Sequence, residues 1–203
     1  MKRVYKYITG VILAGGKSSR MGLAKEFLSV NGRPILDNVL DALNPLFSEI
    51  LVVTNDKKRF PDLKRAKVVE DLVRERGPLG GIYTGLRAAS CEKAFFVACD
   101  MPFLHNALIR RLLDYARKND CDCVIPRYAE RIQPLHAVYS RKIIQTIEDL
   151  LKGKDLSVMQ LIKRCKCKYI DANKEEAASF LNINTPQDLK EIEAYARKIQ
   201  SLA

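Results

Sequence analysis

Short apolar runs bounded by turn residues alternate along the chain with stretches in which apolar residues recur every three to four positions. Runs of the first kind predict β-strands, and the second pattern predicts amphipathic helices. Strands that alternate with helices are typical of an α/β fold with a mainly parallel sheet. The predicted strands are Ile8–Ala14, Ile50–Thr54, Lys67–Val69, Ala94–Cys99, Cys121–Ile125, Leu135–Tyr139, Cys167–Ile170 and Phe180–Ile183.

Two helical patterns stand out. Over His105–Lys118 apolar residues recur at intervals of four and form one stripe. The last helix has the clearest start, because Thr185 can cap it, Pro186 suits the first helical position and Asp188 is the third residue. No internal repeat or low-complexity linker interrupts the chain. We therefore expect residues 1–203 to form one domain.

Composition narrows the class of protein. The chain has 203 residues, 47% of them apolar, which is enough for a full hydrophobic core. The longest apolar run is far too short to cross a bilayer, so we expect no membrane partner. The N-terminus imitates a secretion signal, but its apolar centre, Val11–Ala14, is too short and leads into a glycine loop. Six cysteines are too few for a disulfide scaffold at this size, which favours the reducing cytoplasm.

The net charge of +11, from 35 basic and 24 acidic residues, suits a nucleic-acid-binding protein, a small anionic substrate or a solvated basic surface. The basic residues are scattered, and the chain has no tryptophan on which bases could stack. A non-enzymatic nucleic-acid-binding protein would also leave Asp71 and Asp100, discussed below, without a role, because carboxylates repel phosphate. We therefore expect no nucleic-acid partner.

The first predicted strand leads into a loop of glycines and basic residues, Leu13-Ala14-Gly15-Gly16-Lys17-Ser18-Ser19-Arg20-Met21-Gly22, which Lys25 follows. Ligands bind beyond the carboxyl ends of strands in open parallel sheets, and adjacent glycines let backbone N–H groups approach phosphate oxygens. Arg20 and Lys25 add positive charge for the same phosphates. The spacing fits neither the Walker loop nor the dinucleotide fingerprint. For Gly15 and Gly16 alone, a tight turn is the alternative.

A second glycine-rich loop follows the third predicted strand. Glu70 and Asp71 end that strand, and Gly77-Pro78-Leu79-Gly80-Gly81 lead into a helix that ends near Ala89. A helix start of this kind offers backbone N–H groups to an anion or to the edge of a base. Taken alone, Asp71 is a surface charge, a cap or a ligand group.

The third loop, Cys99-Asp100-Met101-Pro102-Phe103, follows the apolar run Ala94–Cys99. A carboxylate at the tip of a buried strand is a common way to hold Mg²⁺, which takes one or two carboxylates plus substrate oxygens. Asp100 lies several residues before the next helix, so its position favours metal binding over capping.

Other polar residues carry weaker signals. Gln133 and His136 flank the start of a strand, and Asn182 and Asn184 would share one face of the last predicted strand. Such an amide pair either contacts a ligand or satisfies backbone groups. His136 has no Ser or Cys partner in an evident arrangement, so we do not assign it as a catalytic base. The Cys-x-Cys pairs at 121/123 and 165/167 are atypical for zinc, and burial in strands explains them.

Five motifs occur in one order along nearly the whole chain: LAGG-K-x-x-RMG-x-x-K at 13–25, E-D-x(5)-GPLGG at 70–81, CD-x-PF at 99–103, QPL-x-A-x-Y at 133–139 and F-x-NINTPQDL at 180–189. Together they resemble the molybdenum cofactor guanylyltransferases, within the wider nucleotidyltransferase group. The resemblance implies a three-layer α/β/α sandwich, with a Rossmann-like, mainly parallel sheet of the nucleotide-diphospho-sugar transferase type. It also implies transfer of GMP from GTP to molybdopterin or the molybdenum cofactor, with release of pyrophosphate and with Mg²⁺ as cofactor.

The resemblance and the loop chemistry divide the candidate residues into three groups. Those expected to bind the nucleotide are Leu13, Ala14, Gly15, Gly16, Gly22, Lys25, Asp71, Gly77, Pro78, Leu79 and Asp100. Those expected to act in catalysis are Arg20, Lys25 and Asp100, and Asp100 is also the expected magnesium ligand. Gln133, Asn182 and Asn184 are expected to support the pterin side or catalysis.

Some details depart from the family or stay open. Ala24 stands where family members often carry an acidic residue, and the sequence does not single out which of Val53-Thr54-Asn55 contacts the nucleotide. The nearest alternatives are a molybdopterin cytidylyltransferase and a sugar-phosphate nucleotidyltransferase, although LAGG and GPLGG favour the guanylyl branch. Cofactor-carrier and cofactor-loading proteins are further expected partners.

Overall fold

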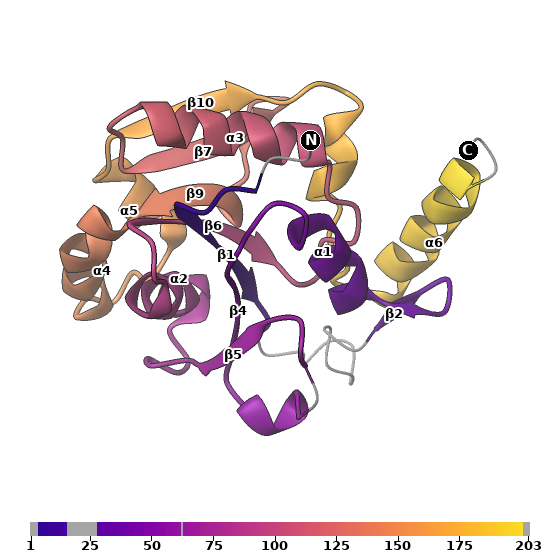
Figure 1. Cartoon of the computed structure of the whole chain (residues 1–203), viewed down its shortest axis with the longest axis horizontal. Coiled ribbons are helices and arrows are strands. Elements are labelled where there is room, and N and C mark those ends of the chain that lie inside the picture. The colour runs from indigo at the N-terminus through magenta and orange to yellow at the C-terminus, as the bar shows by residue number, and fades with distance from the viewer. Residues whose placement is uncertain (1–3, 16–27, 62, 201–203) are drawn as a thin grey trace.

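The central element of the structure, a computed structural model that describes residues 4–15, 28–61 and 63–200, is a β-sheet. Its strands are β1 Ile8–Leu13, β4 Ile50–Thr54, β5 Lys67–Glu70, β6 Lys93–Ala98, β7 Cys123–Tyr128, β8 Arg131–Ile132, β9 His136–Ser140 and β10 Cys167–Asp171. They are arranged in the order β10-β7-β9-β6-β1-β4-β5, with β8 paired to β7 (Figure 1). A separate hairpin pairs β2 Ser29–Val30 with β3 Arg33–Pro34.

Most neighbouring strands run parallel. Strand β1 is parallel to β4 and β6, β4 is parallel to β5, and β7 is parallel to β10. Strand β9 runs antiparallel between β6 and β7. Every residue of β1 and β4 is buried, as expected for central strands that are covered on both faces. The prediction of a mainly parallel α/β sheet is confirmed.

Helices cover both faces of this sheet. One face carries α1 Ile35–Leu43, α3 Asn106–Lys118 and α6 Pro186–Gln200, and the other carries α2 Gly77–Ala88, α4 Ile144–Leu151 and α5 Val158–Lys163 (Figure 1). Strand β1 contributes to both cores, because successive side chains point to opposite faces. Ile8 and Ile12 lie in the first core, whereas Val11 and Leu13 lie in the second. The three-layer sandwich is therefore confirmed.

Helix α6 begins as its sequence predicts. The Thr185 hydroxyl accepts a hydrogen bond from the Asp188 N–H at 3.1 Å, and the Asp188 carboxylate accepts one from the Thr185 N–H at 2.9 Å. This reciprocal pair is a capping box, which satisfies two N–H groups at the start of the helix.

The strand predicted at Phe180–Ile183 is wrong, whereas the other seven predicted strands are present, Ile50–Thr54 with its predicted bounds and six with shifted ends. Residues 176–180 form a short 3₁₀ helix, and residues 181–184 are irregular. Among the described residues no strand pairs with this segment: the Ile183 N–H donates at 3.2 Å to the carbonyl of Asp100, which lies in a turn. Alternating burial arises here from an extended loop, so Asn182 and Asn184 do not share a strand face.

Buried polar contacts hold the 3₁₀ helix on α3. The carboxylate of Glu176, which is nearly fully buried, accepts hydrogen bonds from the Arg111 guanidinium at 2.7 and 2.9 Å. It also accepts one from the Asn173 N–H at 2.9 Å. A buried carboxylate requires such partners. These contacts position the segment that continues to Asn182.

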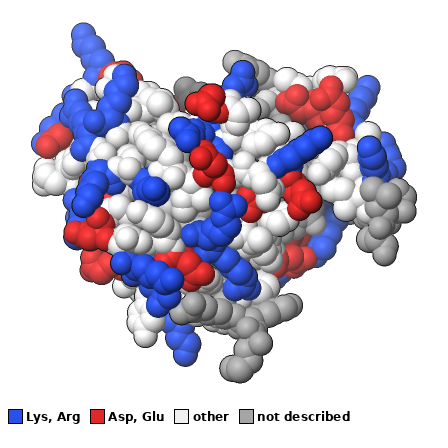
Figure 2. All heavy atoms as spheres, turned by 90° about the horizontal axis from the view of Figure 1, so that it is seen from above, with Lys and Arg blue, Asp and Glu red and all other residues white. Residues whose placement is uncertain are grey.

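The surface mixes both signs of charge. In the view from above, Lys and Arg side chains are interspersed with Asp and Glu, so the net charge of +11 is not gathered in one patch on this face (Figure 2). Among the described residues, no helix combines the length and the apolar character needed to cross a membrane.

Candidate active site

The order of the strands creates a crevice at the carboxyl ends of β1 and β6. From β1 the chain passes to β4 and β5 on one side, and it then returns to β6 on the other side. The two strand ends stay joined, since the Cys99 N–H donates to the Leu13 carbonyl at 3.1 Å. Open α/β sheets bind ligands at such a switch point. Three of the predicted loops start from this edge.

A pocket of about 490 Å³ lies on the β4 and β5 side of the crevice, within the size range of small-molecule sites. It is lined by the ends of β1, β4 and β5 and by the first turns of α2. The lining residues are Leu13, Gly15, Val53, Thr54, Asn55, Asp71, Glu75, Gly77, Pro78 and Gly81. The structure thus brings together Leu13, Gly15, Asp71, Gly77 and Pro78 from two loops far apart in the sequence.

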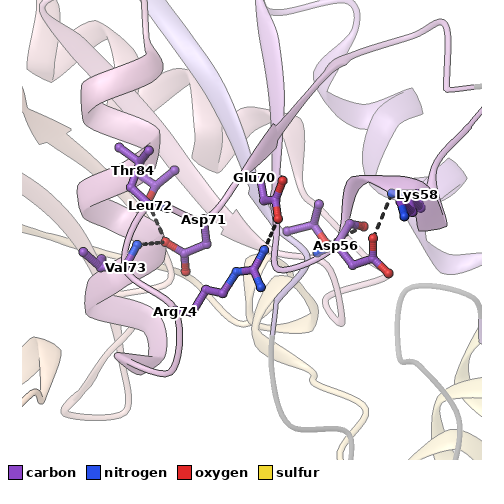
Figure 3. Close-up of polar contacts among 9 residues, drawn as sticks. Asp56, Lys58, Glu70, Asp71, Leu72, Val73, Arg74 and Thr84 are labelled. Carbon is purple, nitrogen blue, oxygen red and sulfur yellow. Dashed lines mark hydrogen bonds and ion pairs between the residues drawn. The ribbon is translucent and has the colours of Figure 1, made fainter.

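Asp71 is held firmly at the wall of this pocket (Figure 3). Its Oδ1 accepts hydrogen bonds from the Thr84 hydroxyl at 2.6 Å and from the Val73 N–H at 3.1 Å. Thr84 is fully buried, and its Oγ1 also accepts from the Leu72 N–H at 3.0 Å. These bonds occupy one carboxylate oxygen and fix the rotamer. The second oxygen is available to accept a hydrogen bond from a ligand.

The first turn of α2 forms another wall. Gly77 has a φ of +60°, in the region that favours glycine, and Pro78 occupies the start of the helix, where its missing N–H costs nothing. Arg76 at the N-cap makes no side-chain capping bond. The uncapped N–H groups and the positive end of the helix dipole therefore suit an anionic ligand at this wall.

Asn55 is a polar residue of the pocket that sequence reasoning left unassigned. It follows β4, and a Cβ placed on Gly15 would lie 3.5 Å from its Nδ2, so its amide lies beside the first loop. The signal that could have found it is positional, because β4 and β1 are neighbours and their carboxyl ends meet. Ala14 and Leu79, which were also predicted to bind the nucleotide, are buried in the two apolar cores and do not line the pocket.

The β6 side of the crevice is built around Asp100, which is half-buried in the turn after β6. The hydrogen bond from Ile183 to the Asp100 carbonyl brings Asn182 and Asn184 beside it, two residues that the sequence places 82 and 84 positions away. The Asn182 Oδ1 is buried and has no hydrogen-bond partner among the described residues. Carboxylate and amide oxygens are the donors that Mg²⁺ takes in proteins, so these residues fit such an ion.

The turn at Gln133–His136 borders the same end of β6. The Leu135 carbonyl accepts from the Ala98 N–H at 3.1 Å, and the His136 N–H donates to the Gln133 carbonyl at 3.1 Å. Gln133 therefore lies on the side of the crevice where Asp100 and Asn182 are found.

His136 opens β9 and is fully buried. Its ring meets Phe95 and Phe180 edge to face, at centroid distances of 5.2 and 5.6 Å. Neither ring nitrogen has a hydrogen-bond partner among the described residues. Burial lowers the pKa of His136 to about 3, so the imidazole is neutral at pH 7 and poorly matched to general-base catalysis near neutrality.

Four of the predicted residues, Gly16, Arg20, Gly22 and Lys25, lie outside the described residues. Their contacts with the phosphates stay predictions. Within the described part of the chain, no three His, Cys, Asp or Glu side chains are arranged to hold a metal ion, which leaves Asp100 with its neighbouring amides as the predicted position for one.

Comparison with known proteins decides the family. Residues 10–168 match the MobA-like NTP transferase domain. A probable molybdenum cofactor guanylyltransferase of Natranaerobius thermophilus is 35% identical over 202 residues, which cover 95% of this chain and 98% of the relative. The chain belongs to the molybdenum cofactor guanylyltransferase family. A further member, from Syntrophotalea carbinolica, is 36% identical over 91% of this chain and 90% of its own length.

A solved structure supports the same family. The molybdopterin-guanine dinucleotide biosynthesis protein A of Archaeoglobus fulgidus matches with a TM-score of 0.83 and 27% identity, over 94% of this chain and all of that chain. The prediction of a guanylyltransferase of the nucleotidyltransferase class, drawn from five motifs, is therefore confirmed. The described part of the first motif and the second and third motifs lie at the carboxyl ends of β1, β5 and β6, and the fourth and fifth motifs reach the end of β6 through Leu135 and Ile183.

Proposed function

We propose that this chain transfers GMP from GTP to the molybdenum cofactor, giving molybdopterin guanine dinucleotide and pyrophosphate. The observation that carries the proposal is the adjacency of two subsites on either side of the end of β1. One is the pocket with Asp71 and the start of α2, and the other is the group formed by Asp100 and residues 182–184. Curated relatives that match nearly the whole chain bear the name of this activity.

The pocket receives GTP in this proposal. The free oxygen of Asp71 accepts a hydrogen bond from the nucleotide, and the uncapped N–H groups of α2 face its polar or anionic edge. Asn55 adds an amide at the mouth of the first loop. Arg20 and Lys25 then neutralise the triphosphate, because that loop continues from the end of β1.

The acceptor takes the other subsite. The residues that would hold Mg²⁺ are Asp100, as the carboxylate, and Asn182, as a neighbouring amide oxygen. When bound, the ion supplies neutralisation of charge on the reacting phosphates. Gln133 and Asn184 would orient the pterin, which the backbone contacts of their segments at the end of β6 support.

The chemistry needs no protein nucleophile. The terminal phosphate of the pterin attacks the α-phosphorus of GTP in line, and the bond from that phosphorus to the bridging oxygen breaks as pyrophosphate leaves on the opposite side. The chain contributes positioning of both substrates and compensation of developing charge, which together supply most of the rate enhancement in phosphoryl transfer.

A turnover assay tests the proposal directly. The purified chain is mixed with Mg²⁺, the molybdenum cofactor and either GTP or CTP, and pyrophosphate and dinucleotide are both quantified. We expect one pyrophosphate per guanine dinucleotide, formed only when GTP and the acceptor are both present. Faster turnover with CTP would move the chain to the cytidylyl branch, and no pyrophosphate with either nucleotide would refute transfer.

The proposal includes the compartment in which the reaction takes place and the partners of the chain. The six cysteines are all unpaired thiols, which suits a reducing cytoplasm. Carrier and loading proteins would deliver and receive the cofactor. The mixed charges of Figure 2 favour a small anionic substrate over nucleic acid, and filter binding at two salt concentrations checks this.

A further inference from the structure

Three of the six cysteines, Cys123, Cys165 and Cys167, lie around the amino ends of β7 and β10. This end of the sheet is opposite the candidate active site. Cys123 is the first residue of β7, and Cys167 is the first residue of β10. The two are register partners in a parallel pair, although 44 positions separate them in the sequence. The Cys123 thiol interacts with the thiols of both Cys165 and Cys167. Cys121, by contrast, lies in the core on the other face of the sheet.

The backbone geometry suits a bond between Cys123 and Cys167. Neighbouring strands lie about 4.8 Å apart, and disulfides join Cα atoms that are about 4.4 to 6.8 Å apart. Register partners on parallel strands project from the same face, and both thiols belong to the core beneath α4 and α5. No change of register is therefore needed to join them.

Cys123 and Cys167 differ in how exposed they are, and this difference assigns them different roles. Cys123 is 1% exposed, whereas Cys165 and Cys167 are only half-buried, so a small reagent meets them before Cys123. The Cys123 thiol stabilises a neighbouring thiolate by hydrogen bonding and so lowers the pKa of Cys167. A thiolate is the attacking species in disulfide exchange, which makes Cys167 the first thiol to react.

A metal site would be the competing interpretation of three clustered thiols. The described residues contain no group of three ligands arranged around a common point for a metal. Cys167 also directs its thiol to the Ile162 carbonyl at 3.5 Å. A pairwise bond fits this arrangement better than a shared ion.

We propose that Cys123 and Cys167 are an oxidation site, which forms one intrachain disulfide when the protein meets a low-molecular-weight disulfide. The Cys167 thiolate attacks the reagent, forms a mixed disulfide and releases one small thiolate. Cys123 then loses its proton and attacks the Cys167 sulfur, and the second small thiolate leaves. Two protein thiols are oxidised, and one small disulfide is reduced to two thiols.

The position of the bond determines what it changes. It would tie the edge strand β10 to β7 at the amino ends of both strands, whereas the nucleotide pocket lies at the carboxyl ends of β1, β4 and β5. A crosslink closes the loop between residues 123 and 167 in the unfolded chain and so stabilises the fold. We expect a higher Tm and an unchanged Kd for GTP.

The test uses the full chain, incubated with oxidised glutathione under native conditions and then alkylated. Mass spectrometry without reduction is expected to show two fewer alkylated thiols per chain and a peptide crosslink between Cys123 and Cys167. Cys165→Ser and the distant control Cys91→Ser should leave this crosslink in place. Cys167→Ser, which alters a half-buried position, should abolish it while the variant still binds GTP.

Three outcomes of the oxidation experiment would overturn the proposal. They are a stable glutathione adduct with no crosslink in the chain, a crosslink that survives in Cys167→Ser, and a crosslink that weakens GTP binding about tenfold or more, which would show that the native fold does not accommodate the bond. Stoichiometric zinc binding that blocks alkylation of all three thiols would overturn it in favour of a metal site.

Discussion

Buried polar groups on the two sides of β1 differ in whether they have hydrogen-bond partners. On the β4 and β5 side, Asp71 is fixed by Thr84 and by a backbone N–H before any ligand is present. On the β6 and β9 side, the Asn182 Oδ1 and both ring nitrogens of His136 have no partner among the described residues. Each buried polar atom of this kind costs about 1 to 3 kcal/mol.

The nucleotide side is therefore preorganised, whereas the acceptor side needs a ligand to complete its hydrogen bonds. The nucleotide side can bind as it stands, because its polar groups are already oriented. The acceptor side holds unsatisfied oxygen and nitrogen atoms, a cost that a bound ion, water or pterin group would relieve. We therefore expect substitutions on the two sides to affect different steps of the reaction.

The largest effect is expected for Asp100→Asn on the acceptor side. Losing the Asp100 carboxylate at the end of β6 should lower kcat about a hundredfold or more, since removal of one group that stabilises transition-state charge costs this much. The fold should persist, because Asp100 is half-buried and belongs to no apolar core. Steady-state kinetics and a melting curve check both statements. A normal kcat would refute the metal assignment.

On the nucleotide side, Asp71→Asn should act on binding. The amide oxygen can keep the bonds to Thr84 and Val73, but the charge on the second oxygen is lost. A hydrogen bond to a charged group contributes about 1.5 to 3 kcal/mol, so the Kd for GTP should rise about tenfold to a hundredfold. Calorimetry measures it. An unchanged Kd with a reduced kcat would contradict the division between the two sides.

Two glycines offer a matched pair. A Cβ on Gly85 would lie 2.5 Å from the Phe96 ring, so Gly85→Ala should destabilise the fold by about 1 to 3 kcal/mol through overpacking. A Cβ on Gly15 would lie 3.5 Å from Asn55 Nδ2, an ordinary contact, so Gly15→Ala should fold normally.

Because Gly15 lines the pocket, its added methyl group should weaken GTP binding about tenfold. Denaturant unfolding and GTP titration of both variants separate the two effects. The pairing fails if Gly15→Ala unfolds easily or if Gly85→Ala keeps full stability.

Near neutral pH the smallest effect is a pH dependence from His136, which grows only as the solution is acidified. Its pKa is about 3 in the folded state and near 6.5 when unfolded, so only the unfolded chain takes up a proton between these values. The free energy of unfolding is therefore highest, as far as His136 is concerned, above pH 6.5. Between pH 6.5 and about 3 it falls by at most about 1.4 kcal/mol per pH unit. His136→Phe should flatten this part of the stability profile. An identical profile in that variant would show that other groups control the acid sensitivity.

The parts of the fold that the sequence predicts well are those with local causes. Strands β1 and β4 contain the apolar runs Val11–Leu13 and Ile50–Val53, and the capping box of α6 lies within four residues. The failure at Phe180–Ile183 has a non-local cause, since alternating burial predicts a strand only where another strand is available to pair with it.

The residues of the site also divide into those with a local cause and those with a non-local cause. Asp71 and Asp100 were predictable, because each follows an apolar strand in a glycine- or proline-containing loop. The contact between the 182–184 segment and Asp100, the place of Asn55 and the meeting of Cys123 with Cys167 depend on strand order and register. Those features bring together residues that no local pattern connects.

If the nucleotide side is assembled before the acceptor arrives and prefers guanine, it binds GTP without the pterin. A calorimetric titration of the purified chain with GTP and, separately, with CTP measures this directly, with Mg²⁺ present and no pterin. We expect one GTP bound per chain and a Kd for CTP at least about tenfold higher. Tighter binding of CTP, or no binding of GTP until the acceptor is added, would refute a preassembled guanine site.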